Sequence, residues 1–287
     1  MFTHNPVTPV RLEILVDLLR SYPRGLPRKE VCRMLQPESL NSDLGNSSPS
    51  AVTVSAALEL GLAQEEEGDL SLSAACRKRK QDSRLDILTA FDARVLSSVE
   101  VEKYFALFYS YYLGLGKQVY VRRSQNKDQW ADQFNQALGL EDNSQENRFN
   151  ATKLTGLHRW FNYVGLGWYD PIGEFQANPY DRLLRALPLI FGRQGKLEAD
   201  EFMPKLSDAC PELDGGALFL QANPGWDASA KRCTLGLSHA LIELHLDKII
   251  QLHCPADSPG WNIADAEPPG GNNFKSHRFA VVEQLKD

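Results

Sequence analysis

The sequence contains no long hydrophobic run and no paired cysteines. In 287 residues, no segment approaches the ~20 apolar residues that a transmembrane helix needs, so we expect no membrane contact. The longest aromatic stretch, residues 104–115, is interrupted by Ser110 and Gly114 and predicts a buried helix. The five cysteines are scattered, and no two form a C-x-x-C pair. This usage is typical of reduced thiols, and together with the absence of a recognisable secretion signal it predicts a cytoplasmic protein.

The sequence also lacks an excess of positive charge. Its 31 Lys and Arg residues are outnumbered by 37 Asp and Glu residues, which gives a formal net charge of -6. Proteins that coat nucleic acid with their whole surface are usually basic, so that class is excluded, whereas a single local DNA-binding face is not. The contents of hydrophobic residues, 43%, and charged residues, 24%, are typical of folded domains. The length allows two or three small ones.

Motifs for catalysis and metal binding are missing as well. Residues 113–117 are rich in glycine and end in Lys117, but they lack the first glycine and the hydroxyl residue of a phosphate-binding loop. His239 and His245 are six residues apart, which does not suit two metal ligands on one helix face, and His253 with Cys254 does not complete a known pattern. We therefore expect no enzymatic activity, no metal and no cofactor.

The first eighty residues predict three short helices followed by a β-hairpin. Pro9 and Pro49 occupy first-turn positions, with Thr8 and Ser48 as candidate N-caps. Gly61 ends the third helix, and the residues on both sides of a Gly-Asp turn then alternate in polarity as in a hairpin. This pattern resembles the winged helix-turn-helix family, which we assign to residues 1–80. The alternative is a generic three-helix bundle with a surface hairpin.

The third predicted helix would face DNA in such a domain. Its hydroxyl residues Ser50 and Thr53 are candidate DNA contacts, but its leading residues include no Arg, Lys, Asn or Gln. Residues 1–80 contain ten Lys and Arg and ten Asp and Glu, and acidic residues crowd the hairpin tip. This first domain therefore suits protein docking better than DNA binding. The basic run after the hairpin either grips a phosphate backbone or is a solvated linker: Arg77, Lys78, Arg79 and Lys80.

The same pattern recurs in the middle of the chain. Val164-Gly165-Leu166 repeats Leu60-Gly61-Leu62, and in both places an apolar helix precedes the motif and a Gly-acid turn or its equivalent follows. This predicts a second winged-helix domain within residues 81–192, with the aromatic segment as its first helix. Candidate DNA contacts here lie on the helix before the glycine and further upstream, where Tyr120 and Trp130 are interleaved: Lys153, Thr155, His158, Arg159, Arg122 and Arg123. The alternative is that the aromatics are core and the cations cover the surface.

A third copy is predicted within residues 193–287. Residues 234–246 form an apolar helix, 249–253 a strand and 261–263 a possible return strand, while 279–285 is expected to dock as an edge strand. Nine Lys and Arg against fourteen Asp and Glu make this region acidic, which favours a protein partner over DNA. The expected fold is mainly α with small β-hairpins, in two tandem winged helices with this region as a further copy.

Two segments carry a resemblance to a known family. Residues 153–179, with Gly-Leu-Gly-Trp at 165–168, and the opening residues 4–11 resemble DpdG, a protein encoded with bacterial 7-deazaguanine DNA-modification systems. The resemblance implies an accessory protein of DNA modification, restriction or phage defence, and it transfers no catalytic residue. We therefore expect a non-enzymatic, DNA-associated subunit whose partners are duplex DNA and other subunits of such a complex.

Other functions remain open at this point. An acidic scaffold made of tandem winged helices, similar to the subunits that bind the kleisin of chromosome-organising ATPases, would have the same composition. A transcriptional regulator would also fit. A nuclease or transglycosylase fits least, because no acidic or metal-binding cluster supports it.

Overall fold

The protein is mainly helical. The computed structural model describes residues 7–36, 48–78, 82–122, 125–140, 148–264 and 278–285. These residues form α-helices and small antiparallel sheets of two or three strands, which confirms the expected fold class. No described helix is long and apolar enough to cross a lipid bilayer.

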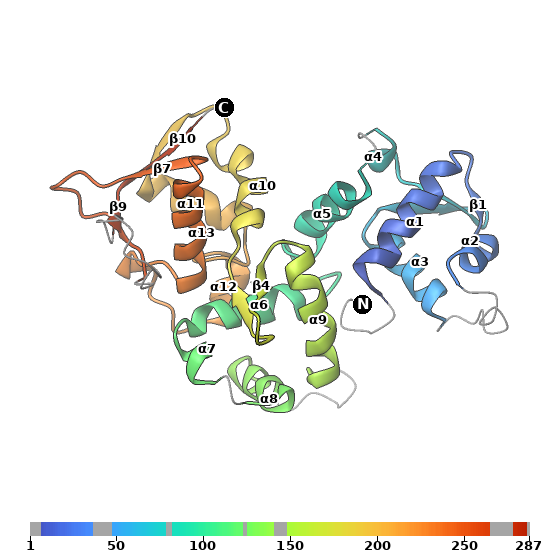
Figure 1. Cartoon of the computed structure of the whole chain (residues 1–287), viewed down its shortest axis with the longest axis horizontal. Coiled ribbons are helices and arrows are strands. Elements are labelled where there is room, and N and C mark those ends of the chain that lie inside the picture. The colour runs from blue at the N-terminus through green and yellow to red at the C-terminus, as the bar shows by residue number, and fades with distance from the viewer. Residues whose placement is uncertain are drawn as a thin grey trace. The chain divides into compact units, whose positions relative to one another are not determined.

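The chain divides into two compact units, each of which is described separately. The first unit holds Met1–Phe105 and Thr152–Trp160, and the second holds Ala106–Ala151 and Phe161–Asp287. In the first unit the elements are α1 (Pro9–Ser21), β1 (Leu26–Pro27), α2 (Arg28–Met34), α3 (Pro49–Glu59), β2 (Ala63–Glu66), β3 (Asp69–Leu72), α4 (Ala74–Arg77) and α5 (Ser83–Arg94) (Figure 1). The unit boundaries fall within α6 (Phe105–Leu115) and α9 (Ala151–Tyr163).

In the second unit the remaining helices are α7 (Gln118–Val121), α8 (Lys127–Ala137), α10 (Tyr180–Phe191), α11 (Ala199–Ala209), α12 (Ala217–Ala222) and α13 (Leu235–Leu246), with a 3-10 helix at Ala228–Ala230. Its strands are β4 (Gly167–Tyr169), β5 (Phe175–Ala177), β6 (Lys196–Glu198), β7 (Ile250–His253), β8 (Trp261–Asn262), β9 (Arg278–Phe279) and β10 (Val281–Gln284).

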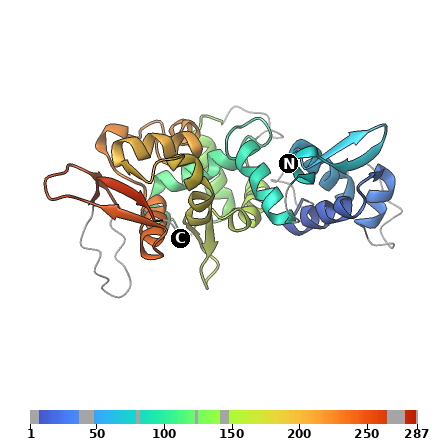
Figure 2. The same ribbon diagram turned by 90° about the horizontal axis from the view of Figure 1, so that it is seen from above.

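Local sequence signals explain the start of the first unit. The Thr8 hydroxyl accepts a hydrogen bond from Arg11 N at 3.3 Å and caps α1, whose first residue is Pro9. Ser48 caps α3 in the same way. The strands form an antiparallel sheet in the order β1-β3-β2, and Figure 2 shows the β2–β3 hairpin (cyan) extending past the helices of this unit. The three helices and the β2–β3 hairpin lie where the sequence predicts them, whereas strand β1 was not predicted. The winged-helix assignment itself stays a prediction.

The second unit repeats this connectivity. The order α10, β6, α11, α13, β7 and β10 matches α1, β1, α2, α3, β2 and β3. The second unit has insertions at two points: α12 with the 3-10 helix before α13, and β8 with β9 between β7 and β10. The sheet order β6-β10-β7 also matches β1-β3-β2, so the last strand is central in both. Backbone contacts agree: Arg28 N donates to Gly68 O at 2.9 Å, and Ala199 N donates to Ala280 O at 2.7 Å. We name these repeats the N-terminal module (residues 9–72) and the C-terminal module (residues 180–284).

Two sequence-based expectations for the C-terminal region were wrong. Residues 279–285 were expected to form an edge strand, but β10 lies between β6 and β7. The return strand expected at 261–263 pairs instead with β9, as β8. Val281 and Val282 of β10 are both buried. This burial favours the central position in the sheet, because a buried strand is stabilised by neighbours on both edges. Helix α10 also packs against α11 and α13.

Within the described residues the same helix ending occurs four times. A residue with positive φ ends α3, α9 and α13, namely Gly61 (φ 67°), Gly165 (φ 75°) and Lys248 (φ 60°). The next amide then bonds the carbonyl five residues back: Leu62 N to Ala57 O at 2.9 Å, Leu166 N to Phe161 O at 2.9 Å, and Ile249 N to Leu244 O at 3.0 Å. Helix α8 ends in the same way at Gly139 (φ 61°), with Leu140 N bonding Asn135 O at 2.8 Å. This is the Schellman arrangement, and the three cases other than α8 each precede a strand. It confirms the chain reversal predicted at Gly61 and Gly165.

Aromatic side chains form much of the core around α6 and α9. In the second unit the Phe108 ring packs against Phe134, Phe149 and Phe161, with ring centroids 5.1, 5.1 and 6.3 Å away. In the first unit the buried Trp160 stacks on Phe91 at 4.9 Å, and its indole nitrogen donates to Val7 O at 3.2 Å. These phenylalanine and tryptophan rings are therefore core, and they fix α9 in place. Of the two aromatics interleaved with the candidate cations, Tyr120 is exposed and Trp130 is half-buried, so their role in base stacking stays a prediction.

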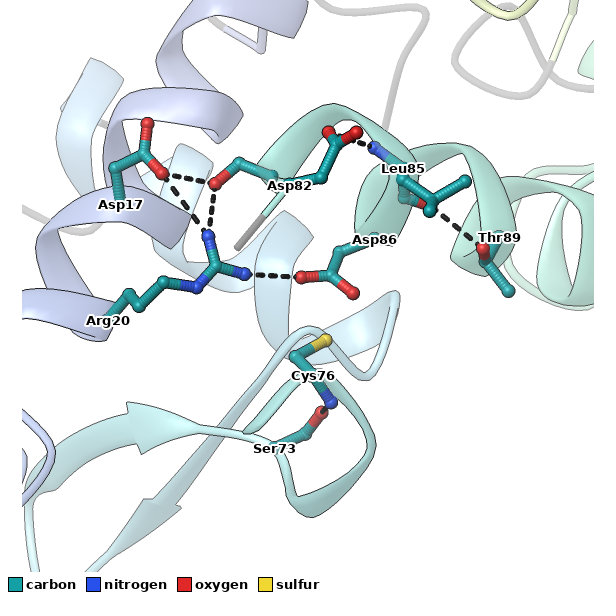
Figure 3. A network of polar contacts seen from close by, with 9 residues as sticks. Asp17, Arg20, Ser73, Cys76, Asp82, Leu85, Asp86 and Thr89 are labelled. Carbon is teal, nitrogen blue, oxygen red and sulfur yellow. Dashed lines mark hydrogen bonds and ion pairs between the residues drawn. The ribbon is translucent and has the colours of Figure 1, made fainter. Parts of the chain in front are cut away.

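An ionic network joins α1 to α5 in the first unit. Figure 3 shows Arg20 between Asp17 and Asp86. Arg20 Nη2 lies 2.5 Å from Asp86 Oδ2, and Nη1 donates to Ser83 Oγ at 2.6 Å. The Ser83 hydroxyl donates in turn to Asp17. The Asp86 side chain is fully buried, so this ion pair, unlike an exposed one, determines where α5 docks.

Candidate nucleic-acid interface

Helix α9 carries four of the predicted DNA contacts. Its apolar residues Leu154, Leu157 and Trp160 are buried, and at helical spacing this leaves the opposite face for polar side chains. Arg159 on that side is exposed, while Lys153, Thr155 and His158 are half-buried. The structure thus brings together, on one helix in the first unit, the residues that the sequence predicted to act together.

Lys153 and Arg159 are in different environments. The Lys153 ammonium lies 5.1 Å from the centroid of the Tyr104 ring, a distance typical of a cation–π contact. Partial burial lowers the pKa of Lys153, and the nearby Glu102 partly opposes that effect. Because Glu102 compensates part of the lysine charge, the exposed Arg159 is the stronger candidate for a phosphate contact.

The predicted contacts on α3 point inward. Ser50 and Thr53 are buried. The Ser50 hydroxyl donates to Gln36 Oε1 at 3.0 Å, and the Thr53 hydroxyl donates to Pro49 O at 2.7 Å. Both hydroxyls are therefore bonded within the fold, and neither residue contributes to the exposed surface of α3. The exposed position on α3 is the acidic Glu59.

The predicted basic residues outside α9 have varied surroundings. Arg77 and Lys78 are exposed at the end of α4, and Arg79 and Lys80 lie outside the described residues. In the second unit Arg122 donates to Tyr111 Oη at 3.0 Å, Gln133 Oε1 at 2.9 Å and Gln118 Oε1 at 3.1 Å. It therefore bridges α6, α7 and α8 within the fold. Arg123 also lies outside the described residues.

Sequence reasoning missed a groove in the second unit. The groove has a volume of about 530 Å³ and is lined by Lys117, Trp226 and Arg232 beside the first turn of α13. These residues come from segments more than a hundred positions apart. No periodic pattern marks them, and only Lys117 stands near the cations that the sequence singled out.

These observations can be compared with known proteins. Over residues 3–258 the chain matches the DpdG-like family. The chain belongs to the DpdG-like family. No curated protein and no solved structure matches it. The match agrees with the resemblance carried by residues 4–11 and 153–179, and it fits a role in a DpdG-associated system.

The histidines of this DpdG-like chain have protein partners. His245 Nδ1 accepts from Leu252 N at 3.2 Å, and His253 Nε2 lies 3.1 Å from Glu283 Oε2. Burial lowers the pKa of His239, and burial followed by the proximity of His253 lowers that of His245. Within the residues that the structure describes, no group of three or more His, Cys, Asp or Glu could hold a metal ion.

Proposed function

We propose that this member of the DpdG-like family is a non-enzymatic accessory subunit of a bacterial 7-deazaguanine DNA-modification system, acting in restriction or phage defence. Family membership supports the assignment to that system. In the proposal the N-terminal and C-terminal modules and the α9–β4–β5 segment are tandem winged helices. Helix α9 contacts duplex DNA, and the remaining surfaces bind other subunits of the complex.

One observation carries the DNA-binding part of this proposal. In winged helices the helix before the hairpin enters the major groove, and here that position is taken by α3, α9 and α13. Neither α3 nor α13 contains a Lys or Arg residue, whereas α9 contains Lys153 and Arg159. In a chain with a net charge of -6, a single cationic helix at this position favours local contact with the DNA backbone.

A salt-dependent mobility shift with duplex DNA tests the proposal. We expect Arg159→Ala to weaken binding, and Lys153→Ala/Arg159→Ala to weaken it further. Because each phosphate contact contributes about 0.9 to the slope of log affinity against log salt, the double variant should reduce that slope by about two. Arg193→Ala/Lys196→Ala removes the same charge from exposed positions in the second unit and is the matched control.

The result that would reject direct DNA binding is equally specific. Phosphate contacts are strongest at low salt, so the absence of any shift at ~50 mM salt excludes them. Equal weakening by the control variant would show that the loss of DNA binding follows from the change in net charge and not from contacts made by α9. Thermal unfolding of each variant checks that α9 remains folded, because Lys153 also contacts the Tyr104 ring.

A second candidate function is protein docking by the N-terminal module. Helix α1 exposes Val10 and Ile14 to 61% and 52%, one helical turn apart. The hairpin tip exposes Glu66 and Glu67, which would repel phosphate. This combination favours the scaffold alternative, in which the module binds a protein partner as kleisin-binding subunits do, over a transcriptional regulator that reads DNA through α3.

Co-purification with the products of neighbouring genes, after nuclease treatment, tests the docking function. We expect Val10→Asp/Ile14→Asp to abolish co-purification and to leave the DNA mobility shift unchanged. If the partner still co-purifies with this variant, the docking surface does not include Val10 and Ile14. Loss of both activities together with a lower melting temperature would show only that α1 had been disrupted.

A further inference from the structure

The second unit contains a polar groove beside the first turn of α13. Its volume is about 530 Å³, and its walls come from the end of α6, the start of α7, the loop after α12, the segment before α13 and the residues at the end of β8. Two cationic side chains line it, Lys117 and Arg232, together with the Trp226 ring. The size lies within the range of ~300–1,000 Å³ that is typical of small-molecule sites.

The position of Arg232 is fixed from both sides. Its guanidinium carbon lies 4.7 Å from the centroid of the Trp226 ring, and that ring meets Phe219 edge-on at 5.0 Å. The neighbouring backbone is held to β8, because Cys233 N donates to Asn262 O at 2.9 Å and Asn262 N donates to Lys231 O at 2.7 Å. The exposed guanidinium is therefore held before any ligand arrives, which lowers the entropy cost of binding.

The floor of the groove is also rigid. The Asn223 amide donates to Ser110 O at 2.9 Å and to Phe219 O at 3.0 Å, which ties the end of α12 to α6. A Cβ at Gly114 would lie 1.9 Å from Asn223 Oδ1, so a glycine is required for this close approach. At Gly116 and Gly225 a Cβ would meet nothing within 4 Å, so these positions leave open space along the groove.

The charges in the groove are mostly uncompensated. Within the described part of the chain, neither Lys117 nor Arg232 forms an ion pair, whereas the adjacent Lys231 pairs with Asp200 at 2.6 Å. Two acids are near. Asp214 is buried, with its carboxylate accepting from Thr234 N and Oγ1. The exposed Asp227 accepts hydrogen bonds from Ser229 N and Oγ. These bonds are the main reason that the pKa of Asp227 is lowered, and Arg232 contributes least to that shift.

We propose that this groove binds the phosphate group of a nucleotide or of a nucleic-acid strand, with Arg232 and Lys117 as its cationic contacts. An arginine held against an aromatic ring presents its N–H groups in the fixed geometry that phosphate oxygens match, and a lysine adds a mobile charge. The first-turn amides of the 12-residue helix α13 add a favourable dipole. The site is independent of α9, so either can fail without the other.

Calorimetric titration of the full-length protein with a deoxynucleoside monophosphate tests the proposal, with inorganic phosphate and a short single-stranded oligonucleotide as parallel probes. We expect Lys117→Ala/Arg232→Ala to weaken binding at least ~10-fold, because both charge-assisted hydrogen bonds to the phosphate are lost. The affinity of Arg232→Lys should lie between those of the wild type and the double variant, because lysine keeps the positive charge but loses the planar stacking on the Trp226 ring. Arg193→Ala/Lys196→Ala, and separately Lys153→Ala/Arg159→Ala, should leave mononucleotide binding unchanged.

The three probes distinguish the source of the phosphate. Binding of the mononucleotide without competition from the oligonucleotide assigns the groove to a free nucleotide, and oligonucleotide binding that depends on Arg232 assigns it to a strand. Either result supports the site. No binding of any probe, or binding that Lys117→Ala/Arg232→Ala leaves intact, overturns it. Circular dichroism of the variants confirms that the second unit remains folded.

Discussion

The N-terminal and C-terminal modules share one connectivity but differ in the chemistry of their surfaces. Both place the last strand in the centre of a three-stranded sheet. In both modules the residue after the last strand bonds back to the residue that follows the helix end. Ser73 N donates to Leu62 O at 2.9 Å after the N-terminal module, and Leu285 N donates to Ile249 O at 3.0 Å after the C-terminal module. The helices that would face DNA, α3 and α13, are similar in length, but the exposed residue is the acidic Glu59 on α3 and the apolar Leu246 on α13.

The comparison separates scaffold from function. The shared features are backbone contacts, which any suitable side chains can support, whereas the differences lie in which side chains reach the surface. Cations stand on α9, between the two modules in sequence, and along the groove beside α13. We therefore infer that the repeats provide a frame, and that binding depends on a few added residues.

Buried ion pairs offer the strongest test of how far the two modules are equivalent. The first helix of each module pairs with a buried acid. Arg20 of α1 pairs with Asp86 in α5, which follows the N-terminal module, and Arg182 of α10 pairs with Glu212 inside the C-terminal module at 2.8 Å. Both acids are fully buried. Glu212→Ala removes the acid that pairs with the buried Arg182 side chain, so we expect it to destabilise the protein by about 3–5 kcal/mol, measured by urea denaturation. Asp86→Ala should cost less, because Asp17 still pairs with Arg20 at 3.3 Å.

Two controls sharpen this prediction. Glu201→Ala removes an exposed acid that pairs with Lys205, and it should leave the urea midpoint nearly unchanged, because solvent screens exposed pairs. If Glu212→Ala proves as mild as Glu201→Ala while Asp86→Ala does not, the two anchors are not equivalent. The modules would then share connectivity alone.

Asp214 gives a pH test that applies to the C-terminal region only. Burial raises its pKa from 3.8 to about 6, against the hydrogen bonds from Thr234. The folded protein therefore binds this proton more tightly than the unfolded chain does, so the carboxyl group favours folding below pH 4 and this contribution is lost as the pH rises through 6. The difference between the two pKa values corresponds to about 3 kcal/mol.

Asp214→Asn removes the buried charge. We expect the variant to be more stable than the wild type at pH 7, by up to about 3 kcal/mol, because the Thr234 hydroxyl can turn to accept from the new amide. The gap should close as the pH falls from 6 to 4. Free energies of unfolding across this range measure it, with the exposed Asp208→Asn as control. A gap that does not vary with pH would contradict the prediction.

The sequence revealed the parts of this fold that local signals specify. Thr8, Pro9 and Ser48 marked helix starts, and two glycines marked the junctions after α3 and α9. It did not reveal the central position of β10, since this strand pairs with partners about 30 and 80 residues earlier, and loops of that length leave pairing undetermined by local patterns.

The candidate sites show the same limit. The α9 candidates could be predicted because Lys153, Thr155 and Arg159 lie within two turns of one helix. Only Thr155 and Arg159, four residues apart, share a face, and Lys153 projects from a different side. Ser50 and Thr53 were assigned to a surface because α3 consists almost entirely of small and apolar residues, so its sequence has no polar stripe that would orient it. The groove could not be found, since tertiary structure alone brings Lys117 near Arg232.

The third junction yields the smallest predicted effect. Gly61 and Gly165 adopt positive φ readily, but Lys248 adopts φ 60° with a side chain that disfavours this conformation. Lys248→Gly should therefore stabilise the protein by about 1 kcal/mol, despite the greater flexibility of glycine in the unfolded chain. Lys248→Ala, which keeps the Cβ, is the matched control, and urea denaturation midpoints compare the two. If glycine proves no better than alanine, Lys248 is not strained. The C-terminal module would then end its third helix by a mechanism that differs from the one in the N-terminal module.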